Sequence, residues 1–164
     1  MTPKEFIQQV FINELDKIKS TNPYISFAIM AIGIEFLGKC LDYDAKHWNV
    51  PRKSKDNFEY AINRLDSLSA YRPFLTSHKL WDSLRNGFAH SFVPKYPLTL
   101  SSKDETAHLV LHGNNNNRLN LKCEDFYNDF KKACIKVVNM EFSDPDDKMN
   151  KQLLSVPELE SEDE

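Results

Sequence analysis

The 164-residue sequence has little glycine, little cysteine and no long uninterrupted apolar run. Its 4 glycines and 8 prolines exclude collagen-like chains, and 41% apolar residues exclude a wholly disordered one. The 3 cysteines are odd in number and form no CxxC pair, which argues against a disulfide framework and a zinc site. We therefore expect one folded domain in a reducing compartment, the cytoplasm, with no metal or cofactor.

The N-terminus lacks the uninterrupted apolar core that a signal peptide needs. The most apolar stretch, residues 24–41, is interrupted by Glu35 and Lys39, which disfavours a membrane span. Because Glu35 and Lys39 are four residues apart, a helix would place them together as an ion pair at the rim of a bundle. They could also assist a functional site.

Charge is divided unevenly along the chain. Residues 144–164 hold eight acidic residues and two lysines, a net charge of −6, so residues 1–143 carry +3 within the total of −3. The composition after Phe142 is also poor in aromatic residues. This pattern predicts a folded domain over residues 1–143 and a disordered acidic tail over 144–164.

Apolar residues recur at helical spacing in five segments. The first segment follows a capping box formed by Thr2 and Glu5, with proline at the first helical position. The expected helices run from 3 to about 20, over 23–41, from 58 to about 71, from 76 or 77 through 90, and over 124–138. Gly33 and Gly38 are expected to permit close packing of the second helix, and residues 42–52 are expected to form a loop.

Between residues 97 and 122 the apolar period changes from 3.6 to 2, which is typical of strands. The run from Gly113 to Asn117 suits a hairpin loop because glycine and asparagine tolerate positive φ. The sequence therefore predicts a mainly α fold. It consists of a bundle of about five helices with a small antiparallel β insertion, about 97–122, before the last helix.

The segment Leu-Arg-Asn-Gly-Phe-Ala-His at residues 84–90 carries the clearest chemical signal. Asn86 follows Arg85, four residues separate Arg85 from His90, and the neighbouring apolar stripe predicts a helix. This arrangement resembles the signature of the HEPN superfamily: an arginine, usually a polar residue next, and a histidine after four to six residues. The motif covers under ten residues, and the order of helices extends the resemblance to roughly residues 3–142. The β insertion is not part of the minimal bundle.

Helical geometry indicates how these side chains are arranged. Asn86 and His90 are four residues apart and share a face, so the amide could orient the imidazole. Arg85 and His90 are separated by about 140° around the axis. One chain would struggle to direct both at one phosphate, whereas two copies meeting at a twofold axis could do so.

The resemblance implies a composite site of this kind, and with it a homodimer formed through the helix that carries Arg85, Asn86 and His90. It implies a metal-independent endoribonuclease that acts on RNA, single-stranded or tRNA-like. Toxin–antitoxin or defence roles, with an antitoxin or regulatory protein as partner, are implied in the same way. The positive charge of residues 1–143 agrees with an RNA partner. The acidic tail could compete with RNA, although solubility is its favoured role.

The residue types suit this chemistry. A phosphodiester attacked by its own 2′-OH needs a base near neutral pH and a cation for the developing charge, which histidine and arginine supply. His90 is expected to move the proton and Arg85 to hold the phosphate. DNA lacks the 2′-OH and should not be cleaved.

One position departs from the family pattern. In HEPN toxins silenced by a nucleotidyltransferase, a tyrosine usually stands two residues after the histidine, and this chain has Phe92 there. Silencing by that route is therefore in doubt. Two other functions remain open: a non-catalytic HEPN module that binds a nucleotide or a protein, and a structural helical dimerisation domain.

Overall fold

The N-terminal helix begins at the predicted capping box. Thr2 Oγ1 accepts a hydrogen bond from the Glu5 N–H at 3.3 Å, and the Glu5 carboxylate accepts one from the Thr2 N–H at 2.7 Å. The helix comprises α1 (Pro3–Phe6), a π-helical stretch η1 (Ile7–Glu14) and α2 (Leu15–Ile18). The computed structural model describes residues 1–42, 48, 54–103 and 105–153. The predicted loop over 42–52 therefore lies largely outside the described residues.

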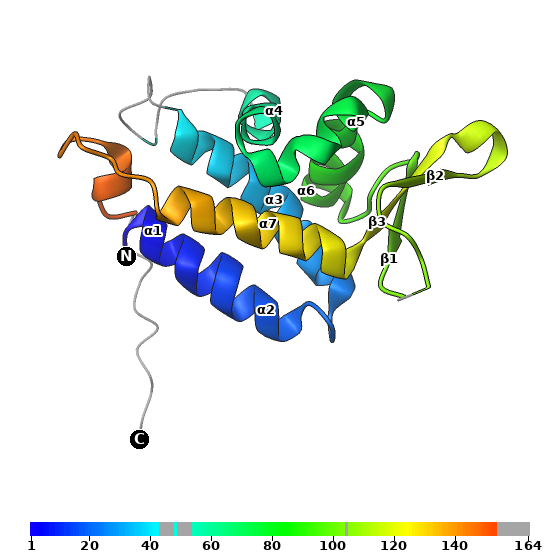
Figure 1. Cartoon of the computed structure of the whole chain (residues 1–164), viewed down its shortest axis with the longest axis horizontal. Helices are drawn as coiled ribbons and strands as arrows, with labels where there is room; N and C mark the ends of the chain where they lie inside the picture. Colours follow the sequence, from blue (N-terminus) through cyan, green and yellow to red (C-terminus); the bar gives the residue numbers. More distant parts are fainter. Residues whose placement is uncertain (43–47, 49–53, 104, 154–164) are drawn as a thin grey trace.

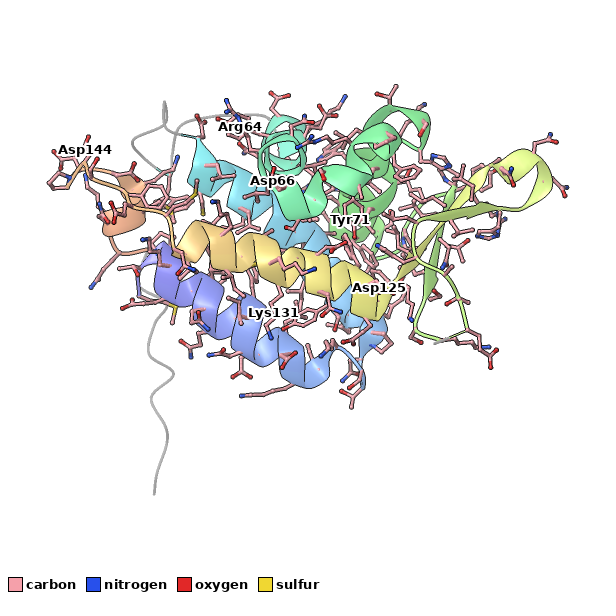
Figure 2. All side chains as sticks on the ribbon, viewed as in Figure 1. Arg64, Asp66, Tyr71, Asp125, Lys131 and Asp144 are labelled. Atoms are coloured by element: carbon pink, nitrogen blue, oxygen red, sulfur yellow. The ribbon has the colours of Figure 1, made fainter. Side chains whose placement is uncertain are left out.

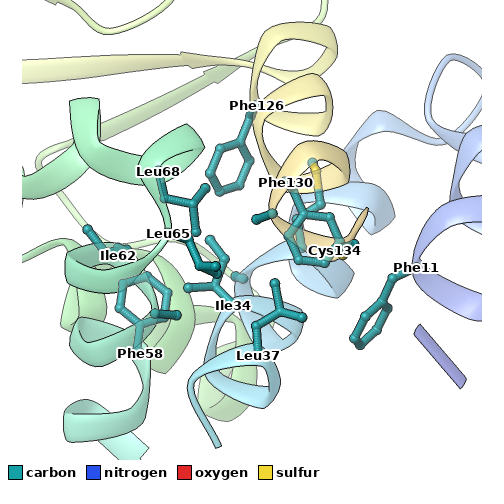
Figure 3. Packing of buried hydrophobic residues seen from close by; sticks show 14 of the residues in the cluster. Phe11, Ile34, Leu37, Phe58, Ile62, Leu65, Leu68, Phe126, Phe130 and Cys134 are labelled. Carbon is teal, nitrogen blue, oxygen red and sulfur yellow. The ribbon is translucent and has the colours of Figure 1, made fainter. Parts of the chain in front are cut away.

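The central helix is α3 (Pro23–Leu41), which packs against α4 (Ser54–Arg64), α7 (Cys123–Val138) and the N-terminal helix (Figure 1). Figure 3 shows Ile34 and Leu37 of α3 among the rings of Phe58 and Phe130. By length and composition α3 is the one helix among the described residues that could span a membrane. However, 56% of its 18-residue apolar segment, Pro23–Cys40, is buried within the body. Its apolar surface therefore serves the core.

Two glycines set the packing distance of α3. A Cβ at Gly38 would lie 1.8 Å from the carbonyl oxygen of Asn57, and one at Gly33 would lie 2.5 Å from Cζ of Phe130. Neither separation is sterically possible without movement of the neighbour. The expectation that these glycines permit close packing is confirmed.

The middle of the chain is more helical than predicted. After α4, a 3₁₀ helix η2 (Asp66–Tyr71) leads directly into α5 (Arg72–Ser77). Pro73 does not interrupt helical structure here because it lies in the first turn of α5, where a missing N–H is tolerated. The described residues thus form six helical stretches longer than one turn, rather than about five.

A three-stranded sheet lies at one end of the body, as expected for residues 97–122 (Figure 1). It consists of β1 (Leu98–Ser101), β2 (Val110–His112) and β3 (Arg118–Lys122), in the order β1-β3-β2. β2 and β3 form the predicted antiparallel hairpin, and its loop has positive φ at Gly113, Asn115 and Asn116.

The expectation of a wholly antiparallel sheet is wrong for β1, which pairs with β3 in parallel. After β1 the chain crosses to the far edge of the sheet before it returns through β3, so β1 and β3 run in the same direction. The leucines of β3, Leu119 and Leu121, are fully buried against the body. The sheet is therefore mixed, with its leucine face directed inward.

The C-terminal segment 144–153 packs on the body, which differs from the prediction of a disordered tail from residue 144. A short 3₁₀ turn, η5 (Lys148–Asn150), buries Met149 and Lys148 almost completely. Lys148 Nζ donates to the Asp42 carbonyl at 2.5 Å, and the Leu153 N–H donates to the Met1 carbonyl at 3.0 Å. These contacts carry the folded structure past the expected boundary at 143, and residues 154–164 lie outside the described residues.

Candidate functional site

The Arg85-Asn86…His90 motif lies on one continuous helical stretch. A π-helical segment η3 (Trp81–Asn86) leads into α6 (Gly87–Ser91). Leu84 and Phe88 are buried on its inner side, which fixes the rotation of the helix against α3. As predicted, the three motif side chains therefore occupy a helix, with Arg85 and Asn86 half-buried and His90 exposed in its last turn.

Arg85 is held by a carboxylate of the central helix. Its Nε forms an ion pair with Glu35 Oε2, and the two side chains are only 18% and 19% exposed. Ser54 Oγ donates to the same Glu35 oxygen at 2.6 Å. Glu35 therefore neutralises the guanidinium of the motif and links the motif helix to α3 and to the start of α4.

This role for Glu35 differs from the expected ion pair with Lys39. The motif helix packs on the side of α3 that carries Glu35, so the carboxylate contacts Arg85 rather than the lysine one turn later. The available signal was a carboxylate in the middle of an otherwise apolar helix. That signal is compatible with a role in the site, but only the packing of η3 on α3 reveals the partner.

Asn86 is directed toward the preceding turn. Its Nδ2 donates to Asp82 Oδ1 at 2.8 Å, and Lys95 Nζ meets the same oxygen at 2.9 Å. The Lys95 hydrogen bond, together with that of Asn86, lowers the pKa of Asp82. Among the described residues, no hydrogen bond joins Asn86 to His90. In this conformation the Asn86 amide instead shares Asp82 with Lys95, which stabilises the helix and the segment that follows it.

The chain reverses sharply after His90. Phe92 ends α6 in the left-handed region, with φ 54°, and the Lys95 N–H donates to the Ser83 carbonyl at 2.7 Å. A Cβ at Gly87 would lie 2.7 Å from the Val93 carbonyl oxygen, so glycine is needed for this close return. The segment after the motif therefore lies directly against the motif helix.

Exposed apolar side chains surround this reversal. Phe92 is 55% exposed and Val93 is 56% exposed. The ring of Tyr24 lies 6.2 Å from that of Phe92, and Tyr24 Oη donates to the Phe92 carbonyl at 2.7 Å. These contacts attach the end of α6 to the start of α3 and leave an apolar surface beside His90.

Within one chain Arg85 and His90 remain apart. Arg85 is directed to Glu35 on α3, and His90 is exposed at the end of α6. No hydrogen bond or ion pair joins Arg85 and His90 in the described part of the chain. These contacts are compatible with the expectation that one chain does not direct Arg85 and His90 at the same phosphate.

Other groups that could carry chemistry are placed in structural roles. Burial raises the pKa of Cys123 to about 11 and also raises those of Cys40 and Cys134, so the thiolate forms are disfavoured. Across residues 1–42, 48, 54–103 and 105–153, no group of three or more His, Cys, Asp or Glu side chains could hold a metal ion.

The comparisons with known proteins add no relative. No protein-family model, curated protein or solved structure matches this chain. An assignment of chemistry therefore depends on the motif and on the contacts around it.

Proposed function

We propose that this protein is a metal-independent endoribonuclease of HEPN type, with a site composed of Arg85 and His90 from two copies of the chain. The proposal is supported above all by the position of His90, exposed at the end of a helix beside an apolar surface. A second copy placed on that surface would bring its own motif helix close to His90. A role as a toxin or defence effector, with an antitoxin or regulator as partner, belongs to the same proposal.

The apolar surface supports a dimer because exposed aromatic and aliphatic side chains are enriched at protein interfaces. It includes Phe92 and Val93 together with Tyr24 and Ile25 at the start of α3, which are 41% and 38% exposed. A twofold contact is self-complementary, so the same patch on both chains suffices.

In the proposed reaction, the 2′-OH of a nucleotide attacks its own 3′-phosphate, and the bond to the 5′-oxygen of the next nucleotide breaks. His90 takes the 2′-OH proton, and the partner chain's histidine protonates the leaving 5′-oxygen. Arg85 would stabilise the negative charge on the phosphate, an effect worth about 10²–10³ in rate for a preorganised donor. Glu35 holds the guanidinium in place until the substrate phosphate competes for it.

The test is cleavage of single-stranded RNA and of tRNA in EDTA by the full chain. We expect His90→Ala and Arg85→Ala to lower the rate by at least 100-fold, whereas Arg64→Ala, which removes an exposed arginine on α4, should cut like the wild type. Intact RNA with the wild type, or undiminished cleavage by His90→Ala, would refute the proposal. Light scattering should give a dimer at micromolar concentration, and Val93→Asp should shift it to monomer.

A non-catalytic nucleotide-binding or partner-binding module is the second candidate. It is favoured by the ion pair between Arg85 and Glu35, which occupies the guanidinium that a nuclease would present to phosphate. Native mass spectrometry of the purified protein separates the two functions. A retained nucleotide without RNA turnover would indicate the binding module.

A further inference from the structure

The sheet has a polar face directed away from the helical body. Because side chains alternate along a strand, the register that turns the β3 leucines inward turns their neighbours outward. The side chains on this outer face are those of Thr99, Ser101, Val110, His112, Arg118, Asn120 and Lys122. Tyr96, which precedes β1, lies beside them and is 62% exposed.

Two adjacent hollows mark this face. One, of about 270 Å³, includes Thr99, Ser101 and Asn120, and the other, of about 290 Å³, includes Tyr96, Asn117 and Arg118. His112 lines both, so the two hollows are neighbours. Among the described residues that line them there is one guanidinium and no carboxylate, which suits an anionic ligand.

The hydrogen-bonding groups of the first hollow are already fixed in position. Asn120 is 7% exposed, and its Nδ2 donates to Ser101 Oγ at 3.1 Å and to the Ala107 carbonyl at 2.7 Å. The His112 Nε2 lies 3.1 Å from Thr99 Oγ1. Because these groups bond to one another, a ligand that enters this hollow would meet mainly apolar surface, held in place by a network that needs little reordering.

The second hollow combines an aromatic ring with a cation. The Arg118 guanidinium carbon lies 5.4 Å from the centroid of the Tyr96 ring. One side of the ring thus contacts the guanidinium, while its large exposure leaves other ring surface for a planar group. Aromatic rings beside arginine are the usual platform for unpaired bases and their phosphates.

We propose that this outer sheet face binds single-stranded RNA, with a base stacked on Tyr96, its phosphate at Arg118 and its edge toward His112. The surface lies on the β insertion and shares no residue with the Arg85 to His90 motif. The choice of RNA over other single strands rests on the proposed function, whereas binding of base and phosphate rests on the sheet alone. The insertion would then hold substrate that the motif helix cuts.

Binding is measured by fluorescence anisotropy of a fluorescein-labelled 12-nucleotide single-stranded RNA in EDTA. All proteins carry His90→Ala in the full chain, so that cleavage cannot distort the measurement. We expect Tyr96→Ala and Arg118→Ala each to weaken binding about tenfold, and Tyr96→Phe to retain it because the ring remains. Arg118→Ala should also make binding less sensitive to salt.

The matched control is another arginine that lies over a tyrosine, Arg64 on Tyr60, with 5.1 Å to the ring centroid. Figure 2 shows Arg64 on the α4 side of the body, away from the sheet. Arg64→Ala should bind RNA within twofold of its parent. Equal losses in Arg64→Ala and Arg118→Ala, or no loss in Tyr96→Ala and Arg118→Ala, would overturn the proposal.

A DNA strand of the same sequence tests the choice of RNA. Weaker binding of the DNA supports RNA as the occupant, and equal binding overturns that choice. The experiments test RNA binding by the sheet surface and RNA cleavage by the motif independently. RNA bound at Tyr96 but never cleaved by the wild type would refute the nuclease alone, and cleavage without any effect of the sheet variants on binding would refute the surface alone.

Discussion

At the scale of single residues, one carboxylate determines the state of the candidate site. Glu35 lies on a helix that is otherwise almost wholly apolar, and it contacts both Arg85 and Ser54. Because both members of the Glu35–Arg85 pair are largely shielded from water, loss of either leaves the other without its counter-charge. The pair therefore couples the folding of the bundle to the position of the motif arginine.

We expect Glu35→Gln to lower the free energy of unfolding by about 1–3 kcal/mol, the usual effect of leaving a shielded polar group without its partner. Urea denaturation measures it, and a double-mutant cycle with Arg85→Gln should show that the two effects are not additive. Glu14→Gln provides the control because Glu14 pairs with Lys17 on the open surface, with side chains 55% and 67% exposed. An additive cycle would contradict the coupling.

A second network joins the sheet end to the helices. His108 Nε2 lies 2.8 Å from Tyr71 Oη, Tyr71 donates to Asp129 Oδ2 at 3.0 Å, and His108 Nδ1 accepts the Lys122 N–H at 3.0 Å. Because Nδ1 is an acceptor, protonation of His108 would break the bond to Lys122. Burial also lowers the pKa of His108, and it lowers that of His78.

These shifts predict that acid destabilises the fold. In the unfolded chain these histidines become protonated below about pH 6.5, whereas in the folded chain they stay neutral to lower pH. The free energy of unfolding should therefore be highest above pH 6.5 and decrease as the pH falls toward 5. Urea midpoints at pH 7.5 and pH 5 test this, and His108→Gln should reduce the difference, with a further reduction when His78→Gln is added. An unchanged difference in both variants would contradict this account.

At the scale of elements, the contact of α3 with α4 determines how the bundle closes. We expect Gly38→Ala to destabilise the protein by about 1–3 kcal/mol or more, because the new methyl group would meet the backbone of α4 at Asn57. Gly33→Ala is the matched comparison, since its methyl group would meet the side-chain ring of Phe130, which can shift. Thermal denaturation should give Gly38→Ala a lower Tm than Gly33→Ala. The reverse order of Tm would contradict the backbone clash.

At the scale of the whole molecule, the C-terminal segment closes the end of the body opposite the sheet (Figure 1). A chain that ends after Phe142 should be less stable than one that ends after Leu153 by roughly 2 kcal/mol, mainly because it loses the buried side chain of Met149. Chemical denaturation of the two truncated proteins gives the difference directly. Equal stabilities would show that residues 144–153 contribute nothing to the fold.

Local patterns were sufficient for most elements and for the helix that carries Arg85, Asn86 and His90. The capping box at Thr2, the glycines of α3 and the asparagine-rich hairpin loop all lie where the sequence predicts them, because each depends on backbone preferences of a few neighbouring residues. The interruption expected between about residue 71 and residue 76 was wrong, because Pro73 begins α5 rather than ending the helix before it, and the local pattern does not distinguish these two positions of a proline.

What the sequence by itself determined was the mainly helical class, the place of the β insertion and the helix that carries Arg85, Asn86 and His90. Tertiary structure alone decided the parallel pairing of β1, the docking of residues 144–153 and the partner of the motif arginine, Glu35 for Arg85. The partners on other elements come from parts of the chain far apart in sequence, which only the packing of the helices and the sheet brings together. Periodicity shows which face of an element is buried, but it does not show which residue of another element lies against that face.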